Sequence, residues 1–337
     1  MNSYAAPERP VACRADAATK VFPAGRGEPV RAVDCVDLTV HAGEVVGIVG
    51  ESGSGKSTLG RMLLRLTRPS SGRIWFNNAE ITTASERHLR LLRPQMQLVF
   101  QDPYGSLNPR MTVGASVGYV LAVNNIGSRT TRRARVAELL DRVGLSAAHA
   151  GRLPHQLSGG QRQRVAIARA IAAEPTLIVA DEPVSALDLS TQAQVLNLFR
   201  ELQAELGLAM VFITHDLAVA EYISDRVVVM YAGRVIEEAA TSTIFTAPLH
   251  PYTRALAAAA ALGTVDRNAF DGEPPNPRNL PPGCAFHPRC PQAVDLCRQK
   301  RPELDPVRGR EASYVACHVA HDADHGRVRS LSLPRSG

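Results

Sequence analysis

The segment Gly50–Thr58, GESGSGKST, has the residue types and spacing that suit phosphate binding. It follows the apolar run Val45–Val49 and precedes a helical pattern, and this order of strand, glycine-rich loop and helix is typical of a P-loop. Glycines let backbone N–H groups turn inward around phosphate oxygens, and the helix adds the positive end of its dipole. Lys56 would add a point charge, and Ser57 a hydroxyl ligand for Mg²⁺. The expected nucleotide contacts are Gly50, Ser52, Gly53, Ser54, Gly55, Lys56, Ser57 and Thr58.

A pair of acids, Asp181 and Glu182, ends the continuous apolar run Leu177–Ala180. Such a run is typical of a buried parallel strand, and α/β sheets bind ligands where their strands end. A carboxylate at Asp181 can hold Mg²⁺ directly or through water. Glu182 is placed to orient or deprotonate an attacking water. The alternative, plain surface charge, is less favoured beside a phosphate-binding loop.

Strands that alternate with helices predict an α/β fold built on a mostly parallel, doubly wound sheet. Met210–Ile213 is a further buried strand, whereas Val36–Val40 alternates apolar and polar residues like a half-buried strand. Two helical patterns, Val113–Val123 and Val136–Val143, interrupt the strands and predict an inserted helical subdomain.

Composition limits the class of protein. The chain has 337 residues, a formal charge of +6, 45% apolar residues and only 5% aromatic residues. No basic stripe is interleaved with aromatics, so we expect no nucleic-acid partner. No apolar run reaches the ~18 residues that cross a bilayer, and the N-terminus lacks an apolar signal region. We therefore expect a soluble, intracellular chain whose partners supply any membrane span.

The motifs together resemble those of ABC ATPases over about Phe22–Glu238. In order, they are GESGSGKST, Gln101, LSGGQ at Leu157–Gln161, LIVADEP, SALD at Ser185–Asp188, and His215. This resemblance implies a P-loop NTPase core with an antiparallel β subdomain, and ATP and Mg²⁺ as ligands. It also implies individual roles: Phe22 stacks on adenine, Gln101 senses Mg²⁺ and water, Asp181 holds the metal, Glu182 is the catalytic base and His215 contacts the γ-phosphate.

LSGGQ also makes physical sense as a helix N-terminus, because its N–H groups can face an anion. In ABC ATPases this segment lies against the γ-phosphate held by a second subunit, which implies a head-to-tail pair. The nucleotide-binding residues implied for this second half-site are Ser158, Gly159, Gly160, Gln161 and Asp188.

Longer motifs resemble the ATPases of oligopeptide and dipeptide importers. They are VFQDPYGSLNPRMTV, LPHQLSGGQRQRVAIARAI, LHPYTRAL and GCAFHPRCP. The resemblance implies a second ATPase subunit, often a different chain, with two membrane permeases and an extracytoplasmic solute-binding protein. The chain would then be peripheral, at the cytoplasmic face of the cell membrane. Tyr104, Leu107 and Met111 are expected to be exposed for permease docking, with local packing as the alternative.

Four cysteines crowd the C-terminal region: Cys284, Cys290, Cys297 and Cys317. Their spacing, C-x5-C-x6-C-x19-C, is not that of a zinc ribbon, and four such thiolates can hold zinc or an iron–sulfur cluster. The resemblance to peptide-importer ATPases favours a 4Fe–4S cluster, with zinc second. Free buried thiols remain a third possibility.

These observations predict a division of the chain. Residues 1–15 are expected to be disordered, 16–247 to form the ATPase domain with its helical subdomain at about 102–156, 248–320 to form the cysteine-containing module, and 321–337 to be a disordered tail. The predicted function is ATP hydrolysis that powers peptide import. The alternatives are another small solute, such as nickel or glutathione, and a soluble ABC ATPase outside transport.

Overall fold

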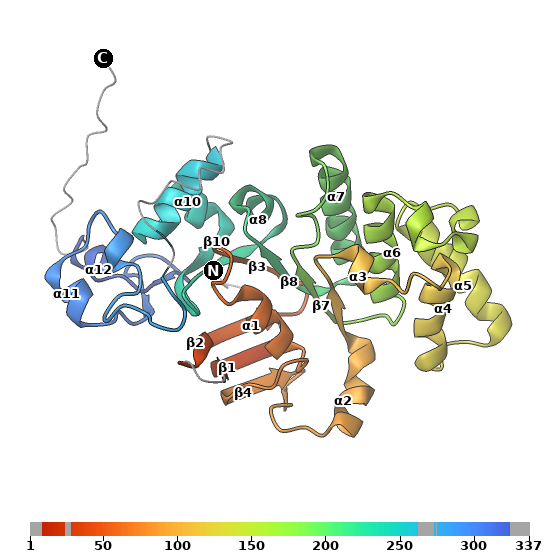
Figure 1. The fold of residues 1–337 in the computed structure, drawn as a ribbon, viewed down its shortest axis with the longest axis horizontal. Helices are drawn as coiled ribbons and strands as arrows, with labels where there is room; N and C mark the ends of the chain where they lie inside the picture. The colour runs from red at the N-terminus through yellow and green to blue at the C-terminus, as the bar shows by residue number, and fades with distance from the viewer. Residues whose placement is uncertain (1–8, 24–27, 262–272, 274, 324–337) are drawn as a thin grey trace, which may run out of the picture.

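The computed structural model describes residues 9–23, 28–261, 273 and 275–323, which form two β-sheets and their covering helices (Figure 1). The larger sheet has eight strands within these residues. In spatial order they are β11 (Asp305–Pro306), β12 (Tyr314–Val315), β10 (Arg234–Ala240), β9 (Arg226–Tyr231), β3 (Val45–Val49), β8 (Ala209–Thr214), β7 (Leu177–Asp181) and β6 (Met96–Val99).

The five strands from β9 to β6 are parallel, and this arrangement positions the site. Every residue of β3, β7 and β8 is buried, which explains their continuous apolar sequences. Their carboxyl ends share one edge of the sheet. The segments that begin at Gly50, Gln101, Glu182 and His215 therefore leave the sheet side by side.

The smaller sheet is antiparallel, in the order β2 (Val30–His41), β1 (Val11–Phe22), β4 (Ser71–Phe76) and β5 (Ala79–Glu80). Helix α1 (Lys56–Leu63) lies over it (Figure 1), and its leucines share a core with both sheets. The expected disorder at residues 1–15 is wrong for residues 11–15, because they begin β1. Cys13 pairs with Val40 on one side and Phe76 on the other, and it is fully buried.

Between β6 and β7 the chain is helical, and these helices gather at one end of the molecule (Figure 1). They are α3 (Pro103–Ser106), α4 (Val113–Val123), α5 (Arg129–Arg142), the 3₁₀ turns η2 (Ala147–Gly151) and η3 (Pro154–Gln156), and α6 (Gly159–Ile171). Leu107 was expected to be exposed, and this is wrong: it is 3% exposed and belongs to the same buried apolar cluster as Val113 and Val117 of α4. Met111 is half-buried, and the side chain of Tyr104 lies outside the described part.

The remaining helices cover the sheets and the C-terminal segment. They are α2 (Glu86–Leu92), the 3₁₀ turn η1 (Arg93–Gln95), α7 (Leu189–Leu206), α8 (Leu217–Ile223), α9 (Thr241–Thr246), α10 (Pro251–Ala261), the 3₁₀ turn η4 (His287–Arg289), α11 (Asp295–Gln299) and α12 (His318–Ala323). The disorder expected from residue 321 onward is wrong for 321–323, which belong to α12, while 324–337 lie outside the described residues. No helix in the described ranges has both the length and the apolarity needed to cross a membrane.

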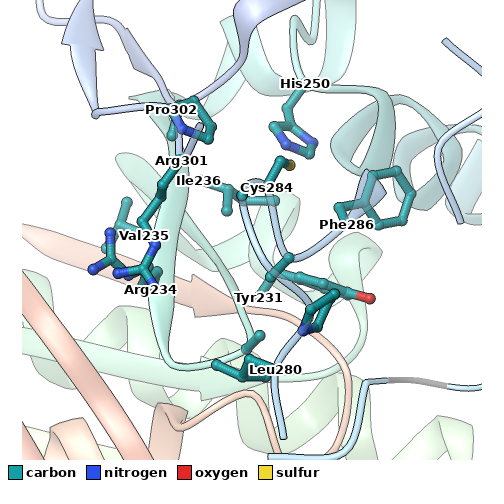
Figure 2. Close-up of a pocket in the computed structure, with 15 residues that line it drawn as sticks. Tyr231, Arg234, Val235, Ile236, His250, Leu280, Cys284, Phe286, Arg301 and Pro302 are labelled. Carbon is teal, nitrogen blue, oxygen red and sulfur yellow. The ribbon is translucent and has the colours of Figure 1, made fainter. Parts of the chain in front are cut away.

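Aromatic side chains attach residues 275–323, here called the C-terminal segment, to the main sheet. The ring of Tyr231 on β9 lies 4.9 Å from that of Tyr252 on α10 and 5.3 Å from that of Phe286. Figure 2 shows Tyr231, His250, Cys284 and Phe286 around the pocket between β9–β10 and this segment. The segment therefore packs directly on the strand beside β3.

Candidate nucleotide-binding site

The loop after β3, here called the phosphate loop (Gly50–Thr58), requires glycine at two of its positions. Gly50 has φ +152°, and an added Cβ would lie 2.2 Å from the Met230 carbonyl oxygen. Gly55, the residue before α1, has φ +101°, and its Cβ would lie 2.1 Å from the Ala32 carbonyl oxygen. Any side chain would clash with backbone at both sites, so the loop keeps its tight curve only with glycine.

Lys56 turns its ammonium group back into the phosphate loop. Its Nζ donates to the carbonyl oxygens of Gly50 and Glu51 at 2.7 and 2.8 Å. The residue is 4% exposed. Burial lowers the pKa of Lys56, and the negative charges of Glu182 and Asp181 oppose this change. The cation is therefore enclosed by acceptors in the place where phosphate oxygens would bind.

Ser57 and Asp181 meet beside this lysine. Ser57 Oγ donates to Asp181 Oδ1 at 2.6 Å, and Arg61 Nη2 lies 4.0 Å from Asp181 Oδ2. Asp181 is 4% exposed, and burial raises its pKa. A hydroxyl and a carboxylate that converge at a strand end are oxygen ligands of the kind Mg²⁺ prefers, so these residues fit the expected metal.

Glu182 is held from two sides at the end of β7. Its Oε2 accepts from Gln101 Nε2 at 3.0 Å and lies 3.2 Å from His215 Nδ1. The hydrogen bond from His215 lowers the pKa of Glu182, and the same bond raises the pKa of His215. The backbone of Glu182 is left-handed, with φ +46°. The carboxylate is thus kept ionised and oriented, as a group that handles water needs to be.

The residues of LSGGQ begin α6, as the sequence predicts. Ser158 Oγ accepts from the N–H of Gln161, and the side chain of Gln161 accepts from the N–H of Ser158, which forms a capping box. Helix α6 packs on α3, α4, α5, α7 and β6. Gly160 faces α7 so closely that a Cβ would lie 2.2 Å from Thr191 Cγ2.

Asp188 serves as the N-cap of α7. It accepts from the N–H of Thr191 at 2.9 Å and from the hydroxyl of Ser190 at 2.6 Å. These bonds, with that from Ser190 the largest, lower the pKa of Asp188 to about 2. All of these contacts are within the first turn of α7, so the expected contact of Asp188 with a nucleotide stays a prediction. The same holds for Phe22 at the end of β1, whose ring lies 5.0 Å below Lys20 Nζ.

The structure brings many of the predicted residues into two groups. Hydrogen bonds and electrostatic interactions link six of them into one cluster: Lys56, Ser57, Gln101, Asp181, Glu182 and His215. The second group, at the starts of α6 and α7, consists of Ser158, Gly159, Gly160, Gln161 and Asp188. The two groups lie on different elements, which is the arrangement that a site shared between two subunits needs.

The four clustered cysteines lie near one another in the C-terminal segment. The N–H of Cys284 donates to the carbonyl of Cys297 at 2.8 Å. Burial raises the pKa of the Cys284 thiol to about 11, and the charges of Cys297, Cys317 and Cys290 add to the effect. Within the described residues, however, no group of three or more His, Cys, Asp or Glu side chains is placed to hold a metal ion. The structure therefore supports proximity of the thiols and not the expected metal.

Comparison with known proteins decides the family. A protein-family model described as ABC transporter matches residues 33–185. A second family model, described as oligopeptide/dipeptide transporter, C-terminal region, matches residues 236–297. A probable peptide ABC transporter ATP-binding protein, y4tS of Sinorhizobium fredii, is 49% identical over 316 residues, which cover 91% of this chain and 89% of that protein. The chain belongs to the ABC transporter ATP-binding proteins. It is therefore an ABC ATPase, with ATP and Mg²⁺ as its ligands.

Further relatives and solved structures are also ATP-binding proteins of this family. The oligopeptide transport ATP-binding protein AppF of Bacillus subtilis is 48% identical over 297 residues, covering 86% of this chain and 90% of that protein. Among solved structures, the ATP-binding cassette MJ0796 in a dimeric post-hydrolysis state with ADP and Pi has a TM-score of 0.63 at 35% identity, over 68% of this chain and 98% of that one. The cbiO1 protein of Clostridium perfringens has a TM-score of 0.64 at 32% identity, covering 71% and 92%.

Two residues that contact the phosphate loop of this ABC ATPase were missed at the level of sequence. Tyr252 Oη accepts from the N–H of Glu51 at 2.9 Å, and Arg289 forms an ion pair with the Glu51 carboxylate. Both lie within motifs singled out above, LHPYTRAL and GCAFHPRCP. The motifs marked the residues, but only the fold shows what they touch.

Proposed function

We propose that this ABC ATPase hydrolyses ATP to power the import of peptides through a membrane transporter. The peptide cargo is supported by the C-terminal match at residues 236–297 and by relatives named for peptide transport. The hydrolytic role rests on one observation above all. Glu182 lies at the strand end beside Asp181, with its carboxylate fixed by Gln101 and His215.

Each residue of the cluster has a distinct task in the proposed reaction. Glu182 orients a water molecule and accepts its proton as the water oxygen attacks the γ-phosphorus, and the bond to the bridging oxygen breaks to leave ADP and phosphate. Lys56 and the loop N–H groups bind the phosphates, and His215 contacts the γ-phosphate. Ser57, Asp181 and Gln101 would hold Mg²⁺, which neutralises phosphate charge when bound.

The second group of residues completes the site from another subunit. The first-turn N–H groups of α6, at Gly159 and Gly160, have no intrahelical acceptor and can face the terminal phosphate bound by a partner. Gln161 and Asp188 belong to the same half-site, and Phe22 stacks on adenine. The partners are a second ATPase subunit, two permeases and a solute-binding protein, so the chain works at the cytoplasmic face of the membrane.

A 4Fe–4S cluster at Cys284, Cys290, Cys297 and Cys317 is a further part of the proposal. Its support is the resemblance to peptide-importer ATPases and the mutual electrostatic effect of the thiols. Four cysteine thiolates are the usual ligands of such clusters. Anaerobically purified protein should contain about four iron atoms per chain and absorb visible light; iron-free, colourless protein contradicts the cluster.

The decisive experiment joins purification with an assay. Tagged chain should co-purify with two permeases, and the assembled complex should hydrolyse ATP. Glu182→Gln should slow hydrolysis by roughly 10²- to 10⁴-fold while ATP still binds, because the amide cannot accept the proton. Normal turnover by this variant would refute Glu182 as the base, and recovery without permeases would refute the transport role.

A further inference from the structure

The phosphate loop is joined to the C-terminal segment by a two-pronged ion pair. Arg289 Nη1 lies 3.0 Å from Glu51 Oε2, and Arg289 Nη2 lies 3.0 Å from Glu51 Oε1. The two residues are 238 positions apart in sequence. The Arg289 side chain is 5% exposed and that of Glu51 is 25% exposed. Parallel bonds of this kind fix orientation as well as distance, and burial protects them from screening by solvent.

Glu51 is also held through its backbone. Its N–H donates to Tyr252 Oη at 2.9 Å, and its carbonyl accepts from Lys56 Nζ at 2.8 Å and from the N–H of Ser54 at 3.1 Å. One residue of the phosphate loop therefore touches α10, η4 and the phosphate-binding lysine together. A shift of Glu51 would move an acceptor of Lys56.

Further contacts hold the Arg289 side chain in place. Arg289 Nη1 also donates to Tyr231 Oη at 3.2 Å. Tyr231, Tyr252 and Phe286 pack ring against ring, and Figure 2 shows Tyr231 and Phe286 on the wall of the pocket beneath the C-terminal segment. The guanidinium is thus anchored to β9, the strand next to β3.

The charges of Glu51 and Arg289 bear on the binding of a phosphate ligand by the loop. A carboxylate within a loop that binds a polyanion repels the ligand, and the charge of Glu51 is close enough to act on Lys56. Arg289 lies outside the phosphate loop and neutralises this carboxylate from the C-terminal segment.

We propose that Arg289 is a positioning residue for ATP binding, which orients Glu51 and cancels its charge so that the C-terminal segment sets the affinity of the phosphate loop. The inference rests on the proposed function, because it concerns the same nucleotide site. It assigns the C-terminal segment a role in nucleotide binding that is separate from any metal held by its cysteines.

The test measures MgATP binding and steady-state hydrolysis by the full chain. Arg289→Gln should raise the Kd and KM for MgATP about tenfold, the effect of losing one charge-assisted interaction, with kcat within about twofold of wild type. Adding Glu51→Gln should restore Kd to within about threefold of wild type, because no uncompensated charge remains. Arg289→Lys should be intermediate, since an ammonium cannot form the fork. Arg298→Gln, at an exposed position of α11, is the matched control and should change nothing.

Several outcomes would overturn the inference. Unchanged binding by Arg289→Gln would do so, as would a double variant that binds as weakly as Arg289→Gln alone. If Arg289→Gln does not fold, Glu51→Gln alone decides: it leaves the loop more positive and should bind MgATP tighter, and equal or weaker binding overturns the idea. Wild-type protein that bound no ATP would instead overturn the proposed function, whereas wild type that binds ATP equally with all variants overturns only this inference.

Discussion

At the scale of single residues, Glu182 shows how the sequence places a reactive group. Its left-handed backbone is unfavourable for a non-glycine residue by about 1–3 kcal/mol, and such strain gathers at functional sites. The N–H of Glu182 donates to the Ile213 carbonyl at 2.9 Å, which ties the strained residue to β8. The carboxylate of this residue contacts both Gln101 and His215.

The interaction between Glu182 and His215 contributes to stability within a defined range of pH. The contribution of Glu182 to stability is present above its ordinary pKa of 4.5 and is lost as the pH falls through its lowered pKa. The contribution of His215 is present below its ordinary pKa of 6.5 and is lost as the pH rises through its raised pKa. Between these two ordinary values, 4.5 and 6.5, both partners are charged in the folded chain, and the orienting bond is strongest there.

The contribution of His250 to stability should depend on pH with the opposite sign to that of His215. It is fully buried, and burial lowers its pKa to about 3 from the ordinary 6.5. Its Nδ1 accepts from the N–H of Tyr252 at 3.1 Å. Between these two values the unfolded chain binds a proton that the folded chain does not, so this residue should lower the free energy of unfolding by about 1.4 kcal/mol for each pH unit below 6.5.

His250→Asn tests this, because its amide oxygen can replace the Nδ1 acceptor while the titrating ring is removed. Urea unfolding of both proteins from pH 7 to pH 4 should show a shallower loss of stability in the variant. The nearby Glu237 and Arg254 are common to both proteins and cancel in the comparison. His88→Asn, at an exposed position of α2, should keep the wild-type slope. Equal slopes for His250→Asn and wild type would contradict the assignment.

At the scale of elements, Leu107 belongs to the core of the helices between β6 and β7. It belongs to the same buried apolar cluster as Val113 and Val117, and Arg169 of α6 donates to the carbonyl of Ser106 next to it. Leu107→Ala should therefore lower the free energy of unfolding by about 2–5 kcal/mol, the usual effect of a buried leucine truncation. Chemical denaturation of the purified chain measures it.

Val123→Ala provides the control for this prediction. Val123 ends α4, and the residue is 58% exposed. A substitution there should change the free energy of unfolding by no more than about 0.5 kcal/mol. Should Leu107→Ala also fall within that range, the leucine would be a surface residue in solution, as the sequence first suggested.

These elements also show what sequence can predict. The runs Val45–Val49 and Leu177–Ala180 are apolar throughout because both faces of the sheet are covered, so they identify buried strands directly. Ser158 and Gln161 have the spacing of a capping box and mark the start of α6. Such local signals placed members of the six-residue cluster around Glu182 at strand ends, and parallel strands then bring those ends together.

Contacts between distant segments are what the sequence does not reveal. The start of β1 contains charged residues and looked disordered, because its burial depends on pairing with β2 and β4. Leu107 looked exposed because nothing in the local sequence indicates that it joins a buried apolar cluster. The ion pair of Glu51 and Arg289 joins residues 238 positions apart, and neither residue type implies the other. Each of these features follows from tertiary structure alone.

At the scale of the whole molecule, the two groups of predicted nucleotide-binding residues lie at different places. The phosphate loop follows β3, while the LSGGQ residues start α6, which packs among the helices between β6 and β7 and on α7. A single chain therefore presents a phosphate cradle and, elsewhere, a capped helix start. Head-to-tail pairing would bring the two together around one nucleotide.

A bulky side chain at the start of α6 should therefore block pairing without preventing ATP binding. In the Glu182→Gln background, MgATP should convert the chain to a dimer by size-exclusion chromatography with light scattering. Ser158→Phe should keep it monomeric while the Kd for MgATP stays within about threefold, because the phosphate loop is untouched.

Ser128→Phe is the matched control, since Ser128 is also an exposed N-cap with a capping box, at α5. Loss of either cap should lower the free energy of unfolding by about 1 kcal/mol, so the two variants should be equally stable. Only Ser158→Phe should prevent the dimer. If both variants dimerise with MgATP, the start of α6 does not face a partner's nucleotide, and the shared site fails. If Ser158→Phe instead abolishes ATP binding by the monomer, the helix start acts within its own chain.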